Sequence, residues 1–200
     1  MSTLVKLGPT DHGRPMTYDE YLTGDYQGGY HYELIDGKLY VTPLPNLPEN
    51  RVELWLFRKW DRYSERHPDI INYVTNKSRI FVHSRPDVTT PEPDLAAYHD
   101  FPVNLALEEV RWQEISPLLV AEVLTSDDPE KDMVRNVELF WQVPSIKEYW
   151  ILDIRQNPNR PTMWVYRRGR KKWQIMEVPT GGTYTTKLLP GFKLVLDPRR

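Results

Sequence analysis

The sequence predicts one domain of mixed α/β structure, with a central mixed β-sheet flanked by helices. Three observations predict this class. One long amphipathic stretch indicates a helix, several short apolar segments indicate strands, and such strands dominate the second half of the chain. No repeat, low-complexity tract or linker divides the 200 residues, a length that suits one large domain. We therefore expect residues 1–200 to form a single domain, with a flexible N-terminus over residues 1–15.

The first two elements are a short helix and a hairpin. Thr17 and Glu20 have the spacing of a capping box, in which each side chain satisfies a free backbone amide of the other, so a short helix should follow Thr17. Asp36 and Gly37 then stand between two segments of alternating apolar and polar residues. This arrangement is typical of a β-hairpin, and it places Glu33 on the first strand.

A long helix is predicted from Pro48 to His67. Its apolar residues recur at intervals of three and four, and polar residues occupy the other side. Pro48 suits a first helical turn, and Pro68 ends the stretch. The predicted apolar face consists of Val52, Trp55, Leu56, Trp60 and Tyr63.

The remaining segments are mostly strands. Candidates lie at residues 70–75, 79–83, 94–98, 147–154, 163–167, 172–178 and 193–196. Residues 118–124 are apolar on both alternating faces apart from Glu122, which indicates a central strand covered on both sides. After it, Asp128 as the cap and Pro129 at the first position predict a helix that runs to about Gln142.

Composition excludes several classes of protein. The absence of cysteine excludes disulfides and thiolate chemistry, so any metal must bind to oxygen or imidazole. No apolar run reaches the roughly 18 residues of a bilayer span, and the first residues lack the apolar stretch of a signal peptide. We expect a cytoplasmic protein that does not contact the membrane. The sequence contains neither a glycine-rich phosphate-binding loop nor a GxSxG motif. It therefore gives no support for a kinase, an NTPase, a dinucleotide-binding protein or an α/β-hydrolase.

Charge is distributed unevenly. Residues 155–200 carry eleven Lys or Arg against Glu177 and Asp197, a local charge of +9, whereas the whole chain is −2. The basic segment could be a solvated strand edge protected from aggregation, or a surface that faces phosphates. The same alternatives apply to Arg167–Lys172, either a charged turn at Gly169 or a phosphate-contacting tip. The five histidines show no HxH or HExxH spacing and are expected at the surface or as caps.

Glu122 is the residue that most demands an explanation. A carboxylate inside a doubly covered strand costs several kcal/mol unless a partner compensates it. The partner could be a buried Arg or Lys, another acid that shares a proton, or a divalent cation. Asp94 lies 28 residues earlier, at the start of another apolar strand. Two acids at the ends of neighbouring strands could form an oxygen-lined site for Mg²⁺ or Mn²⁺, and a structural ion pair remains the alternative.

The order of several short motifs resembles a known family. The motifs are Tyr32–Gly37, Pro93-Asp94, Pro117–Leu124, Asp132, Glu148–Asp153 and Leu189–Gly191. Together they resemble the Uma family of restriction endonucleases, within the PD-(D/E)XK nuclease superfamily, over nearly the whole chain. The resemblance implies a restriction-endonuclease-like fold and a Mg²⁺-dependent endonuclease acting on DNA, in a superfamily whose members often form homodimers. It also implies Asp94 and Glu122 as metal-binding acids, with Glu33 as a further acid near the site.

The sequence departs from the family at a lysine. The superfamily lysine two residues after the second acid is replaced by Leu124, and the Uma-like lysine, four residues after Asp132, by Asn136. Helical spacing places Asn136 on the inward face of the helix, and Lys131 and Arg135 elsewhere on it. Asn136 could therefore act at the catalytic position or be a core amide that hydrogen-bonds to the backbone. The candidates for the missing charge are Lys77, Arg79, Lys131 and Arg135.

A second departure lies at residues 47–51, where the family often has a histidine. Two functions therefore stay open. The first is a metal-dependent endonuclease that hydrolyses DNA. The alternative is a catalytically degenerate nuclease fold that serves as a nucleic-acid-binding or interaction module, because fold and activity are separable.

Overall fold

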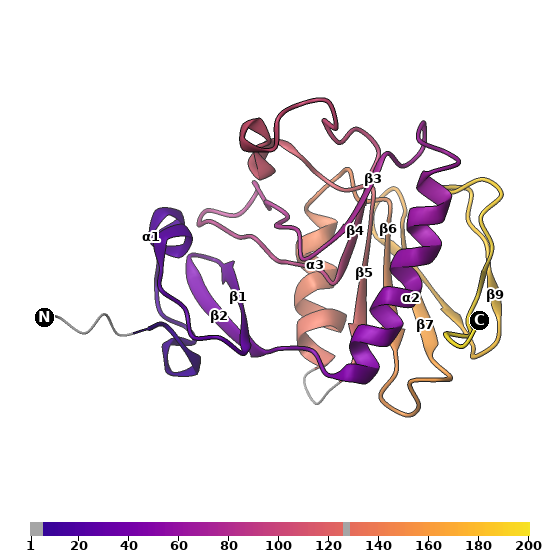
Figure 1. Cartoon of the computed structure of the whole chain (residues 1–200), viewed down its shortest axis with the longest axis horizontal. Coiled ribbons are helices and arrows are strands. Elements are labelled where there is room, and N and C mark those ends of the chain that lie inside the picture. The colour runs from indigo at the N-terminus through magenta and orange to yellow at the C-terminus, as the bar shows by residue number, and fades with distance from the viewer. Residues whose placement is uncertain (1–5, 126–128) are drawn as a thin grey trace, which may run out of the picture.

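The computed structural model describes residues 6–125 and 129–200 and shows a six-stranded sheet in the order β3-β4-β5-β6-β7-β8 (Figure 1). The strands are β3 Tyr73–Asn76, β4 Leu95–Tyr98, β5 Leu119–Leu124, β6 Glu148–Asp153, β7 Thr162–Arg168 and β8 Trp173–Val178. Only β5 and β6 pair in parallel within this sheet. Helix α2 (Leu47–Ser64) and helix α3 (Asn136–Trp141) pack on its opposite faces. This confirms the predicted mixed sheet flanked by helices.

Strand β5 is buried on both faces, as its sequence predicts. Alternate residues, including Ala121 and Val123, pack in the cluster that contains α2, whereas Val120 and Leu124 pack in the cluster that contains α3. Because side chains alternate across a strand, Glu122 shares the face of Val120 and Leu124. Glu122 therefore points to the side of the sheet on which the chain continues into α3.

The N-terminal segment forms a small layer beside the sheet. It contains α1 (Tyr18–Thr23) and the antiparallel pair β1 (Tyr30–Ile35) and β2 (Lys38–Pro43). Asp36 and Gly37 have φ of 48° and 67°, the positive values that a tight hairpin turn requires, so the predicted hairpin is confirmed. The capping box is also confirmed, since Glu20 N donates to Thr17 Oγ1 at 3.2 Å and Thr17 N donates to Glu20 Oε2 at 2.8 Å.

Residues 6–15 differ from the flexible start that the sequence predicted. Leu7 is buried, its amide donates to the carbonyl of Asp25 at 2.8 Å, and its own carbonyl accepts from Gln27 N at 2.9 Å. The 3₁₀ turn η1 (Pro9–Asp11) follows it. These backbone bonds hold residues 6–15 against the hairpin. The expectation for residues 1–5 lies outside the described residues.

Several element boundaries differ from the predicted ones. The long helix begins at Leu47, because Asn46 Oδ1 caps it by accepting from Glu49 N at 3.2 Å. Residues 79–83 form no strand of the sheet; Ile80 N donates instead to the carbonyl of Pro91, at 3.0 Å. The proposed cap Asp128 lies outside the described residues. The shorter elements are η2 Leu107–Glu109, η3 Trp112–Glu114, and the paired strands β9 Thr183–Tyr184 and β10 Leu194–Val195.

The turn between β7 and β8 is a hairpin centred near Gly169, whose amide donates to the carbonyl of Lys172 at 3.0 Å. Arg168 beside it donates to the carbonyls of Phe140 and Trp141, at 2.7 and 2.9 Å, and so caps the C-terminal end of α3. Part of this basic cluster is therefore structural. None of the helices in the described residues has both the length and the apolar composition needed to cross a bilayer.

Candidate active site

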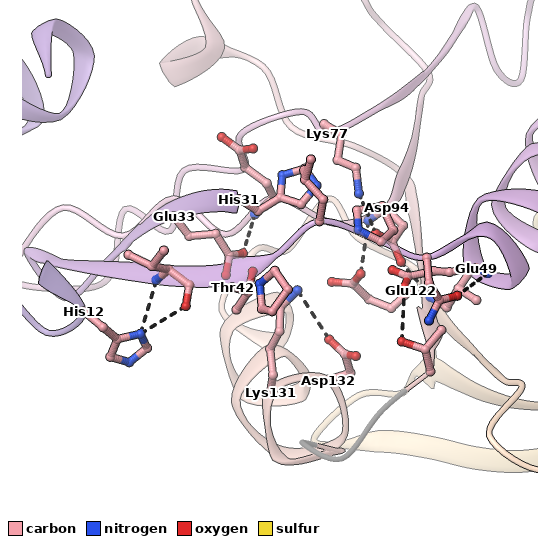
Figure 2. A pocket seen from close by; sticks show the side chains of 18 residues that line it. His12, His31, Glu33, Thr42, Glu49, Lys77, Asp94, Glu122, Lys131 and Asp132 are labelled. Atoms are coloured by element: carbon pink, nitrogen blue, oxygen red, sulfur yellow. Dashed lines mark hydrogen bonds and ion pairs between the residues drawn. The ribbon is translucent and has the colours of Figure 1, made fainter. Parts of the chain in front are cut away.

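A pocket of about 400 Å³ lies between the β1–β2 hairpin, the first turn of α2, the adjacent ends of β4 and β5, and the helical turn that precedes α3 (Figure 2). Its charged and imidazole-bearing lining residues are Glu33, Glu49, Glu92, Asp94, Glu122, Asp132, Lys77, Lys131, His12 and His31. Three of the four predicted site residues line this pocket, and the fourth, Asn136, is fully buried in contact with Glu122.

Strand pairing brings Asp94 and Glu122 together. Leu95 pairs with Ala121 in the antiparallel β4–β5 ladder, so Asp94 stands opposite Glu122. Asp94 N donates to Glu122 Oε2 at 3.1 Å, and Val123 N donates to Asp94 Oδ2 at 2.8 Å. The two carboxylates therefore converge at one edge of the sheet, as the sequence predicts.

Glu122 has little to compensate its charge. It is 1% exposed, and Asn136 Nδ2 donates to its Oε1 at 2.9 Å. No basic group among the described residues forms an ion pair with it. Burial raises the pKa of Glu122 well above its usual value, with Asp132 and Asp94 adding repulsion and Lys131 opposing it.

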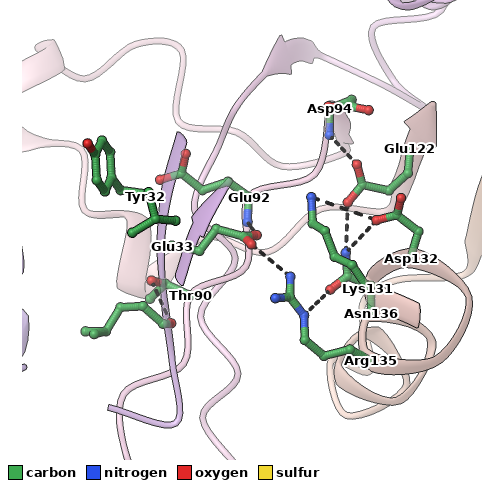
Figure 3. A network of polar contacts seen from close by, with 12 residues as sticks. Tyr32, Glu33, Thr90, Glu92, Asp94, Glu122, Lys131, Asp132, Arg135 and Asn136 are labelled. Atoms are coloured by element: carbon green, nitrogen blue, oxygen red, sulfur yellow. Dashed lines mark hydrogen bonds and ion pairs between the residues drawn. The ribbon is translucent and has the colours of Figure 1, made fainter. Parts of the chain in front are cut away.

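The predicted alternative of an arginine paired with Glu122 is wrong. An arginine does neutralise a buried acid here, but Arg135 Nη2 donates to Glu33 Oε2, at 2.8 Å (Figure 3). Glu33 Oε1 also accepts from Glu92 N at 2.9 Å. Burial alone would raise the pKa of Glu33, but Lys131 and Arg135 outweigh it and lower the pKa to about 2. Glu33 thus lies in the site as expected, as an ionised tether between the hairpin and the helix.

Lys77 neutralises Asp94. Its Nζ lies 2.9 Å from Asp94 Oδ1, and the φ of Lys77 is 54°, a conformation that non-glycine residues adopt infrequently. Burial would raise the pKa of Asp94, but Lys77 and Lys131 reverse the effect and lower it. The pKa values of the neighbouring Asp94 and Glu122 are therefore shifted in opposite directions.

The helix before α3 begins with a π-helical turn over Lys131–Arg135. Asn136 N donates to the carbonyl of Lys131, five residues earlier. The regular helical spacing that placed Lys131 and Arg135 away from the site is therefore wrong: the wider turn directs both toward the acids, together with Asp132 and Asn136 (Figure 3). A π-turn of this kind leaves no composition pattern by which the sequence could reveal it.

The side chain of Asn136 bridges the site. Its Nδ2 donates to Glu122 at 2.9 Å and to Asp132 Oδ1 at 3.4 Å, and its Oδ1 accepts from Arg135 Nε at 3.0 Å. The amide thus reaches the acids that a lysine at this position would reach, but it brings no charge. Burial raises the pKa of Asp132 to about 6, with Lys131 opposing and Asp94 adding to the shift.

Four charged or imidazole-bearing lining residues were not predicted from the sequence: Glu49, Glu92, His12 and His31. Glu49, within the segment where the family often has a histidine, accepts from Thr125 Oγ1 at 3.2 Å, and burial raises its pKa. His12 and His31 line the pocket, where only surface or capping histidines were expected. The Nε2 atom of His31 is buried without a hydrogen-bond partner in the described part of the chain. His31 lies two residues before Glu33 on one strand, so the period of two could have placed both on one face.

The chemistry of the donor set fits a hard divalent cation. Asp94 and Glu122 offer only carboxylate oxygens, and Glu122 forms no ion pair within the described residues. No group of three or more His, Asp or Glu among the described residues forms a complete metal cage. Mg²⁺ is usually bound by one or two carboxylates together with water and substrate phosphates, and a converging pair of acids meets that requirement.

The chain is similar to a solved structure and to one protein family. A solved structure from Anabaena variabilis, described as a "putative nuclease belonging to DUF820", matches with a TM-score of 0.63 and 16% identity, over 92% of this chain and 96% of that one. No curated protein matches the chain. The model of the Uma2 family, described as "Putative restriction endonuclease", matches residues 18–197. Because this match spans nearly the whole sequence, the protein belongs to the Uma2 family, as the order of its motifs indicated.

Proposed function

We propose that the protein is an endonuclease that depends on Mg²⁺ or Mn²⁺ and hydrolyses phosphodiester bonds in DNA. The observation that carries the proposal is the convergence of Asp94 and Glu122 in a pocket where Glu122 lacks a basic partner among the described residues. The family description and the name of the similar solved structure support a nuclease.

Asp94 and Glu122 are the residues that would hold the cation. When bound, a divalent cation makes water more acidic and stabilises the charge of a phosphorane-like transition state. The chain prepares the two acids for this role. Backbone amides of Val123 and Asp94 fix one oxygen of each carboxylate, and Asn136 fixes the other oxygen of Glu122. Each carboxylate oxygen keeps a second lone pair for a further partner.

DNA as the substrate rests on the family description and on charge. Residues 155–200 carry eleven Lys or Arg. Five of them pair with acids or cap α3 in the structure, and the other six can contact phosphates along a duplex. Cutting both strands also suits a homodimer, which light scattering of the protein alone and on a short duplex would detect. Dimerisation and a cytoplasmic location stay predictions.

The direct test is incubation of supercoiled plasmid with the protein and MgCl₂ or MnCl₂. Asp94→Ala and Glu122→Ala should abolish the nicking and linearisation that the wild type produces. Glu148→Gln is a matched control, because Glu148 is equally buried on the neighbouring strand but does not line the pocket. Cleavage that survives both alanine substitutions would rule out this site.

A second candidate function is favoured by Asn136, which stands where the family lysine is expected. A degenerate nuclease fold would bind nucleic acid without metal, with an affinity that falls as salt rises, and would cut no strand. Asn136→Lys separates the two functions. If only this variant cleaves, the wild type is a binding module; if the wild type cleaves, the endonuclease proposal holds.

A further inference from the structure

The site has four basic residues that could replace the charge missing at Asn136, and three of them are already engaged. Lys77 Nζ lies 2.9 Å from Asp94, and Arg135 Nη2 lies 2.8 Å from Glu33. Arg79 Nε lies 2.9 Å from Glu92, and its guanidinium lies 4.9 Å from the ring centre of Tyr21. Each of the three groups therefore already has an acidic partner at hydrogen-bond distance, and these contacts hold the pocket walls together.

Lys131 is different. Its closest acidic oxygen is Asp132 Oδ1, at 3.8 Å, which is too long for a hydrogen bond. Within the described residues its ammonium donates no hydrogen bond, although its side chain lines the pocket and is 24% exposed. Lys131 thus keeps three N–H donors for a ligand that enters the pocket.

The acids around Lys131 keep it charged. Burial alone would lower the pKa of Lys131, but Glu122 and Glu33 oppose this and raise it overall. Figure 2 shows the side chain of Lys131 extending between Glu33 and Asp132. The positive charge therefore lies among the acids that would hold the cation.

The π-helical turn explains how Lys131 reaches this place. In a regular helix, residues five apart point in different directions. The turn instead bonds residue 136 to residue 131, and both side chains meet the carboxylate of Asp132, Asn136 Nδ2 at 3.4 Å and Lys131 Nζ at 3.8 Å. A lysine at position 131 is thus directed to the region that a lysine at position 136 would occupy.

We propose that Lys131 is a catalytic residue that contacts the scissile phosphate and replaces the lysine absent at Asn136. This inference rests on the proposed function. In the hydrolysis, the oxygen of water bonds to phosphorus, the bond from phosphorus to the leaving sugar oxygen breaks, and one proton of the water ends on that oxygen. Lys131 forms no covalent bond; it donates hydrogen bonds and charge to the phosphate oxygens.

The first test is a rescue experiment with plasmid cleavage. Lys131→Ala should lower the rate by about 10²-fold or more, the usual loss when one donor to a transition-state oxyanion is removed. The double variant Lys131→Ala/Asn136→Lys should recover at least tenfold. Lys38→Ala, which removes an exposed lysine outside both the pocket and the basic segment, should leave the rate unchanged. A Lys131→Ala rate equal to wild type, or a double variant without recovery, would overturn the proposal.

The second test measures binding without cleavage, by anisotropy of a fluorescent DNA duplex in CaCl₂ at several salt concentrations. Loss of one phosphate contact lowers the slope of log affinity against log salt by about 0.9. We expect this change for Lys131→Ala and Lys131→Gln but not for Lys38→Ala, which removes an exposed lysine outside the pocket. An unchanged slope would refute the contact whether or not the wild type cleaves. Absence of wild-type cleavage would refute the endonuclease proposal instead, so the two failures are distinguishable.

Discussion

Glu122 and Glu148 are both 1% exposed and lie on adjacent parallel strands, yet their surroundings are opposite. Glu148 Oε1 accepts from Arg167 Nε at 3.0 Å and Thr186 Oγ1 at 2.6 Å, and its Oε2 accepts from the side chains of Trp150 and Tyr184, both at 2.9 Å. Glu122 accepts from one amide side chain and one backbone amide.

The two buried glutamates differ in how far the fold compensates the charge of each carboxylate. Glu148 has an ionic partner and several donors, so the fold compensates its charge fully. Glu122 has other acids nearby and faces a pocket, so the fold compensates its charge less completely than that of Glu148. Burial of a carboxylate alone therefore does not mark a site. Incomplete compensation at a cavity does.

The largest expected contrast is in cleavage. Glu122→Gln should lower the rate of plasmid cleavage by about 10²–10³-fold, because it removes a charge that the transition state needs. Glu148→Gln should leave the rate of the folded protein within a few-fold of wild type. Equal losses in the two variants, with the folded fraction checked by circular dichroism, would erase the distinction between these two buried acids.

The second contrast is in the free energy of unfolding, where we expect the larger loss for Glu148→Gln rather than for Glu122→Gln. Glu148→Gln should lower the free energy of unfolding by about 3 kcal/mol, because it removes the partner of Arg167 and turns an acceptor into a donor among donors. Glu122→Gln should cost less, because it also removes repulsion from Asp132 and Asp94. Urea unfolding near neutral pH measures both values, and a larger loss for Glu122→Gln would contradict this explanation.

A smaller effect concerns Asp132. Its pKa of about 6 in the fold exceeds the unfolded value of roughly 3.9, so its ionisation destabilises the fold above about pH 6, and this cost disappears below about pH 4. Asp132→Asn should therefore add at most about 3 kcal/mol of stability near pH 8 and nothing near pH 4.

Asp153 supplies a control of opposite sign. Arg155 hydrogen bonds lower the pKa of Asp153, so ionised Asp153 stabilises the fold above its unfolded pKa, and this contribution is lost as the pH falls through the folded pKa. Asp153→Asn should destabilise the protein near pH 8. If Asp132→Asn behaves in the same way, the acids around Glu122 are not mutually repulsive.

The sequence predicted the sheet and the long helix, because hydrophobic periodicity determines such elements locally. The meeting of Asp94 with Glu122 was one of several alternatives for Glu122, and the family resemblance favoured it. It placed Lys131 and Arg135 wrongly, because a π-turn depends on tertiary packing and shifts the helical phase. It missed Glu49 and His31, whose role in the pocket depends on how α2 and the hairpin dock. Glu148, at the first position of β6, was noted only as part of a family motif, because its partners lie on β7 and in the C-terminal segment.

The most direct test of the central claim is calorimetric titration of the protein with MnCl₂. We predict a saturable heat for wild type and for Glu148→Gln, and none for Asp94→Asn or Glu122→Gln. A ligand at ten times its Kd should also stabilise the fold by about 1.4 kcal/mol in the variants that bind it. Wild-type protein that takes up no Mn²⁺, or uptake that survives both pocket substitutions, would contradict the claim.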